Sequence, residues 1–152
     1  MPATTEVKEL PVLTLTFAPT GFDRDMTKEN WQLLEDVKGD IPEGISTLNL
    51  ELIPFLNEGE SSVNGEEMKN RSKDLKAHHG QKLAELLLRN QSQIPKEWRQ
   101  FYLAFPGTVW RSPGGGRDVP GLGWVGGRWS LSFLWLGSDW RSVVRLVRFR
   151  ES

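Results

Sequence analysis

The chain has 152 residues, a net charge of −1 at neutral pH and no cysteine. This length is typical of a single domain with its own core, and we expect one domain over residues 1–152. The absence of cysteine excludes disulfide bridges, thiolate zinc sites and cysteine nucleophiles. No apolar run approaches the roughly 20 residues that span a bilayer, and no signal peptide is predicted. We therefore expect a soluble, cytoplasmic protein without a membrane partner.

Alternating apolar side chains predict two strands in the first part of the chain, over residues 10–17 and 46–55. Between them, Thr27 is a candidate helix N-cap. The spacing of Trp31, Leu34 and Val37 then predicts a short helix behind this cap.

Residues 66–90 carry the longest helical pattern, with apolar side chains on one stripe and Lys and Glu elsewhere. Gly80 lies inside this pattern and favours a break near residues 79–81. The polar segment 57–65 is predicted to be a loop, and Pro95 suits the first turn of a further short helix.

After this short helix the chain is predicted to form strands. The glycine-rich segments 112–117 and 125–127 are typical of hairpin turns. Five apolar stretches flank them: 101–105, 107–111, 118–124, 128–136 and 142–149. The sequence thus predicts an α+β fold, in which N-terminal strands and helices (residues 1–90) pack with a tryptophan-rich, antiparallel C-terminal β-sheet (residues 91–152).

Bulky and small residues alternate in this C-terminal part. Alternate side chains of a strand lie on opposite faces, so Trp129, Phe133 and Trp135 are predicted to be buried together, and Ser130 and Ser132 to be exposed. We call the positions between the bulky residues the open positions: Gly121, Gly123, Val125, Ser130, Ser132, Leu134, Ser138, Asp139, Arg141, Ser142, Val143 and Val144. We expect them to form one exposed patch on two antiparallel strands and an adjoining loop over residues 137–144.

The charges are unevenly distributed along the chain. From Glu97 onward there are eight arginines, no lysine and four acidic residues, which gives this part +4 and leaves −5 for the rest. A basic half packed against an acidic half explains this distribution. The alternative is an arginine surface that binds nucleic acid, although such domains usually carry a larger basic excess.

Few residues suggest a catalytic, metal-binding or cofactor-binding role. His78 and His79 are adjacent, so on a helix they point about 100° apart and do not form a metal pair; neither a metal nor a cofactor is predicted. The glycine-rich segment 112–117 lacks the Lys-Ser/Thr ending of a P-loop. Asp118, Asp139 and Glu97 are the carboxylates near the tryptophans, and a carbohydrate-active enzyme would need two of them to face each other across a sugar. No nucleophile motif is present, and an enzyme is not expected.

The C-terminal motifs resemble those of a known group of proteins. They read IP-x-x-W (94–98), F-x-G-T-x-W-R (105–111), V-P-x-L-x-W (119–124), G-x-x-W-x-L-x-F-x-W-L (126–136) and R-L-x-R (145–148), with Trp140 between the last two. Over residues 90–150 the chain is similar to a family of small uncharacterised proteins from bacteria with reduced genomes, from metagenomes and from phages. The resemblance to this family implies no biochemical activity.

The open positions further resemble the variable positions in target proteins of diversity-generating retroelements. Such systems mutate adenines, and AAC or AAT codons then yield Gly, Val, Ser, Leu, Asp and Arg, the residues found here, but not Lys, Glu, Gln, Met or Trp. This resemblance implies a C-type-lectin-like fold with a variable C-terminal region. We therefore expect a non-enzymatic module that binds an unknown protein or other macromolecular ligand through the open positions. A nucleic-acid-associated module is the alternative, and a carbohydrate-active enzyme is a weaker one.

Overall fold

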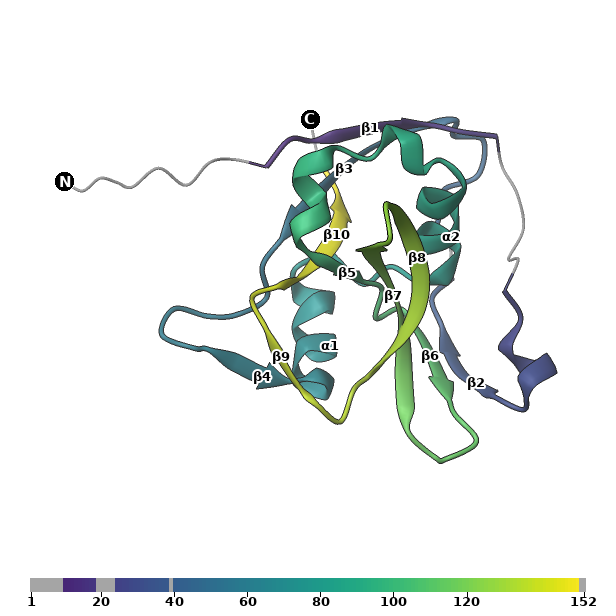
Figure 1. The fold of residues 1–152 in the computed structure, drawn as a ribbon, viewed down its shortest axis with the longest axis vertical. Coiled ribbons are helices and arrows are strands. Elements are labelled where there is room, and N and C mark those ends of the chain that lie inside the picture. Colours follow the sequence, from purple (N-terminus) through teal and green to yellow (C-terminus); the bar gives the residue numbers. More distant parts are fainter. Residues whose placement is uncertain (1–9, 19–23, 39, 151–152) are drawn as a thin grey trace.

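The structure of the protein is a computed structural model that describes residues 10–18, 24–38 and 40–150 (Figure 1). It has the predicted mixed α+β character. The helices are α1 (Gly65–Asp74) and α2 (Gln81–Arg89), and short 3-10 turns cover Met26–Glu29, Gln91–Gln93 and Lys96–Gln100. The strands are β1 (Leu13–Thr16), β2 (Gln32–Asp36), β3 (Thr47–Ile53), β4 (Ser62–Asn64), β5 (Tyr102–Ala104), β6 (Thr108–Arg111), β7 (Arg117–Val125), β8 (Arg128–Trp135), β9 (Asp139–Arg141) and β10 (Val144–Phe149).

Eight strands form one sheet in the order β1-β3-β10-β5-β7-β6-β2, and β8 pairs with β7. The pairings are antiparallel apart from that of β10 with β5, which is parallel. The sheet is therefore not confined to the C-terminal part, because β3 pairs with β1 on one side and with β10 on the other. β4 and β9 form a separate two-stranded pair, which lies beside α1 (Figure 1).

The predicted break in the long helical pattern is confirmed, and it separates α1 from α2. Asn64 caps α1 by accepting a hydrogen bond from the Glu66 backbone N–H at 2.9 Å. The start of α2 is held by the buried Asp40, whose carboxylate accepts from the backbone N–H groups of Gly80 and Leu83, both at 2.9 Å. These bonds fix where α2 begins over the sheet.

The predicted helix behind Thr27 is wrong. A 3-10 turn forms over Met26–Glu29 instead, and its N-cap is Asp25 rather than Thr27. Asn30 adopts a left-handed conformation with φ of 65° and ends the turn. The following residues form β2 and pair with β6 at the edge of the sheet. The predicted loops 57–65 and 137–144 also contain short strands, β4 and β9, which pair through Val63 and Trp140.

Both faces of the sheet are covered. On one face, α2 packs on residues such as Leu103, Leu122 and Trp129. On the other face, α1 and the β4–β9 pair contribute Met68 and Trp140 to a second core, which includes Val119 and Leu146. We call these the α2 face and the α1 face. No helix among the described residues is long and apolar enough to cross a membrane.

Candidate functional site

The β7–β8 hairpin carries many of the open positions and forms as predicted. Its register runs from Asp118 opposite Trp135 to Val125 opposite Arg128. The two residues at its tip, Gly126 and Gly127, have φ of 63° and 83°. Positive φ at both positions is what a type I′ turn requires, and glycine adopts it at no steric cost.

The bulky residues of β8 face α2, but only some of them are buried. Trp129 is fully buried and Phe133 is half-buried, whereas Trp135 is 57% exposed. The prediction of a buried Trp135 is therefore wrong. The burial of each residue depends on what packs over it. α2 packs over the Trp129 end of the strand, and the ring of Trp31, 5.5 Å from that of Phe133, covers the middle of the strand. Trp135 lies beyond both.

Gly121 and Gly123 are buried, so the expectation that they belong to an exposed patch is wrong. A Cβ atom on Gly121 would lie 2.6 Å from Leu134 Cδ1, and one on Gly123 would lie 2.8 Å from Tyr102 Cε1. Each glycine is thus covered by a larger side chain on the α1 face. Leu134 itself is half-buried and packs against the second core.

A smaller surface remains exposed around Tyr102, which we call the Tyr102 patch. It consists of Tyr102, Val125, Ser130, Ser132 and Val144. The strand register places Val144 beside Tyr102, and Ser130 opposite the Gly123 that Tyr102 covers, so one row crosses β10, β5, β7 and β8. Tyr102 is 47% and Val125 62% exposed, whereas Ser130 and Val144 are half-buried. The predicted exposure is therefore confirmed for Ser132 but not for Ser130.

The remaining open positions lie outside this row. Asp139 and Arg141 are exposed on β9, and Ser138 precedes them. Ser142 and Val143 are exposed in the turn that leads into β10. The Val143 carbonyl accepts a hydrogen bond from the Tyr102 backbone N–H at 2.9 Å, so this turn adjoins the Tyr102 patch.

Sequence reasoning missed Tyr102. It is the only tyrosine of the chain, and it alternates with Phe101 and Leu103 in a short strand. That alternation places it on the opposite face from the buried Leu103. The pattern contained this signal, although a strand of three residues is too short to stand out.

The C-terminal arginines do not form one free basic surface. The guanidinium groups of Arg99 and Arg145 lie 3.7 Å and 4.5 Å from the ring centroids of Trp124 and Phe101. Two others pair with carboxylates: Arg117 with Glu66 and Glu35, and Arg148 with Glu51. Half of the eight arginines are therefore held within the fold.

The two histidines make separate contacts. His78 Nδ1 lies 2.8 Å from Ser72 Oγ, and His79 Nδ1 lies 3.0 Å from Asp40 Oδ1. Burial and two nearby lysines lower the pKa of His78 below its usual range. Within residues 10–18, 24–38 and 40–150, no three His, Asp or Glu side chains gather as metal ligands would.

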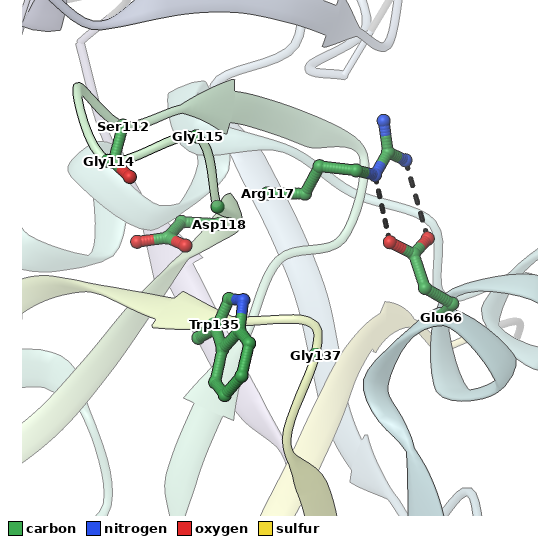
Figure 2. Close-up of a pocket in the computed structure, with 9 residues that line it drawn as sticks. Glu66, Ser112, Gly114, Gly115, Arg117, Asp118, Trp135 and Gly137 are labelled. Carbon is green, nitrogen blue, oxygen red and sulfur yellow. Dashed lines mark hydrogen bonds and ion pairs between the residues drawn. The ribbon is translucent and has the colours of Figure 1, made fainter.

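A pocket of about 670 Å³ opens beside the β6–β7 turn (Figure 2). The turn forms as predicted: the Ser112 N–H donates to the Gly116 carbonyl at 2.9 Å, and Gly115 has φ of 93°. Asp118 and Trp135, paired across β7 and β8, line the pocket together with the turn. Arg117 points away from Asp118 toward Glu66 of α1, and its Nε donates to that carboxylate at 2.8 Å (Figure 2).

Comparison with known proteins gives no match to a protein-family model, to a curated protein or to a solved structure.

Proposed function

We propose that the protein is a non-enzymatic binding module that recognises a protein or other macromolecular ligand through the Tyr102 patch and the exposed turn beside it. The observation that carries this proposal is an exposed tyrosine and an exposed valine among small serine side chains, on a sheet packed on both faces. Tyrosine offers a large amphipathic contact with few rotatable bonds, and serine adapts its hydrogen bonds to different partners.

The scaffold beneath this patch supports the proposal. Tyr102, Gly123 and Ser130 are held side by side by three strands whose other face packs on α2 through Leu103, Leu122 and Trp129. A surface held in this way loses little conformational entropy on binding. The side chains of the patch can therefore change while the strands that present them keep their packing.

The proposal includes the resemblance to target proteins of diversity-generating retroelements. In that case the exchangeable residues are the half-buried Ser130 and the exposed members of the open positions: Val125, Ser132, Asp139, Arg141, Ser142 and Val143. A C-type-lectin-like arrangement is part of the same proposal. One feature supports this arrangement: β3 pairs antiparallel with β10. β3 precedes the two helices and β10 is the last strand.

The gene context tests the retroelement part directly. We expect a near-repeat of the 3′ coding end close to the gene, differing mainly at adenines, beside a reverse transcriptase. The differing codons should fall on the exposed open positions. Differences that fall on buried frame residues such as Trp129 or Leu122 would contradict the proposal.

A binding experiment tests the module itself. A display library randomised at Val125, Ser130 and Ser132 should retain folded variants and yield binders to unrelated protein targets. A matched library randomised at the buried Leu103, Leu122 and Val119 should yield unfolded protein. Binding of the native chain to random DNA, with an affinity that falls steeply with salt, would favour the nucleic-acid alternative instead.

A further inference from the structure

Guanidinium groups cover aromatic rings repeatedly in this fold. Arg99 lies 3.7 Å from the ring centroid of Trp124, and Arg145 lies 4.5 Å from that of Phe101. Arg24 lies 5.7 Å from the ring of Phe133. All three distances are within the range of a cation–π interaction.

Trp135 is the next residue on the same face of β8 after Phe133, and no described cation covers its ring. Its indole is held against the backbone of two glycines: a Cβ atom on Gly137 would collide with the six-membered ring, and one on Gly116 would lie 3.2 Å from Cδ1. The ring is nevertheless 57% exposed. It is therefore a fixed aromatic surface that is open to the pocket (Figure 2).

Asp118 lies directly across the strand pair from Trp135 and lines the same pocket. Within the described chain, no hydrogen bond or ion pair engages its carboxylate. Partial burial raises its pKa above the usual range of an aspartate, because the charged form loses contact with water. An unpaired, partly desolvated carboxylate is a group that gains from a cationic partner.

The other charges at the pocket are already paired. Arg117 is held by Glu66 at 2.8 Å and by Glu35 at 3.2 Å, and Glu35 also binds Lys69 at 2.8 Å. These two cations and two carboxylates balance one another. The Asp118 carboxylate remains as the uncompensated charge of the pocket.

We propose that the Trp135–Asp118 pocket binds the guanidinium group of an arginine on a partner protein. The guanidinium stacks on the exposed indole face, and the Asp118 carboxylate accepts two of its N–H groups in the bidentate geometry that arginine favours. The side-chain-free turn Gly114–Gly116 leaves room for the partner's backbone. Asp118 and Trp135 project from the face of β7 and β8 opposite that of the Tyr102 patch, so this site stands independently of the proposed function.

The test uses N-acetyl-arginine amide as the probe and the indole N–H resonance of Trp135 as the signal. Comparison with a Trp135→Phe spectrum identifies that resonance. A ligand of this size is expected to bind with Kd of about 1 mM, from the free energy per atom that small ligands reach. N-acetyl-citrulline amide, which has nearly the same shape but no charge, should bind at least 10-fold more weakly.

Two variants distinguish binding at this pocket from nonspecific electrostatic attraction of the probe. Asp118→Asn keeps the shape of the side chain and should weaken arginine binding by 10-fold or more. Asp74→Asn, at an exposed carboxylate near the end of α1, should leave it unchanged.

Three outcomes would overturn the proposal. They are equal binding of arginine and citrulline amides, no shift of the Trp135 resonance with the arginine probe, and a shift with methyl glucoside but not with arginine. The last outcome would identify a saccharide site.

Discussion

Tyr102 lies across Gly123, so closely that a Cβ atom on Gly123 would come within 2.8 Å of Tyr102 Cε1. The exposed tyrosine of the patch therefore depends on the absence of a side chain on the neighbouring strand. Leu134 covers Gly121 in the same manner one row further along, but Leu134 also packs against the core of the α1 face.

The two glycines should therefore differ in their tolerance of a side chain. We expect Gly123→Ala to cost less than about 1 kcal/mol of stability, because the half-exposed Tyr102 ring can turn toward solvent. Gly121→Ala should cost about 1–3 kcal/mol, because Leu134 is held by the core and the Leu103 carbonyl lies 3.3 Å from the new Cβ. Urea unfolding measures both, and equal costs would contradict the difference between a free Tyr102 ring and a Leu134 side chain held by the core.

Two fully buried tryptophans should respond differently to the loss of the indole N–H. Trp98 Nε1 donates to the Pro11 carbonyl at 2.9 Å, whereas Trp129 Nε1 is buried without a hydrogen-bond partner in the described chain. Replacement by phenylalanine removes similar volume at both sites. We expect Trp129→Phe to be at least about 1 kcal/mol less destabilising than Trp98→Phe, because only the latter breaks a hydrogen bond and leaves the part-buried Pro11 carbonyl without its donor. Denaturant unfolding of both variants provides the comparison, and a more costly Trp129→Phe would contradict it.

The tip of the β7–β8 hairpin offers a test of the turn geometry. Gly126→Asn should change stability little, because asparagine adopts positive φ and is common in type I′ turns. Gly126→Val should cost about 1–2 kcal/mol, because a β-branched residue is strained at φ of 63°. Thermal unfolding of the pair would reveal the difference, and equal melting temperatures would exclude a type I′ turn.

Local patterns predicted the elements that depend on local contacts. The two N-terminal strands, the break between α1 and α2 and both glycine-rich hairpins follow from alternation and turn residues within a few positions. The segment behind Thr27 has apolar residues at helical spacing, yet it forms β2, because pairing with β6 is a long-range contact that no local pattern contains. The strands β4 and β9 have three residues each and are too short to show alternation.

The candidate site was predicted only in part for the same reason. Alternation correctly assigned Ser130 and Trp129 to opposite faces of β8. It could not show that the α1 face is itself a core, or that Tyr102, some 20 residues earlier in the chain, covers Gly123. Nor could it show that α2 stops short of Trp135. Sequence alternation predicts on which face of a strand a side chain lies. Which element packs over that face depends on the tertiary arrangement.

The unpaired carboxylate of Asp118 should make stability depend on pH in a recognisable way. Burial raises its pKa in the folded protein, so the folded state holds this proton more tightly than the unfolded chain does. The contribution of Asp118 to stability therefore falls as pH rises from the unfolded pKa of about 3.9 through the raised folded value, and is constant above it. Asp118→Asn removes this titration.

We accordingly expect Asp118→Asn to melt at a higher temperature than the wild-type protein at pH 7, and this advantage to disappear near pH 3, where both states hold the proton. Melting curves from pH 3 to pH 7, with Asp74→Asn as the control for loss of an exposed carboxylate, measure the difference. A variant less stable than wild type at pH 7 would mean that Asp118 has a stabilising partner. The expected result would instead show that the chain retains a charge that weakens its own fold, as binding sites commonly do.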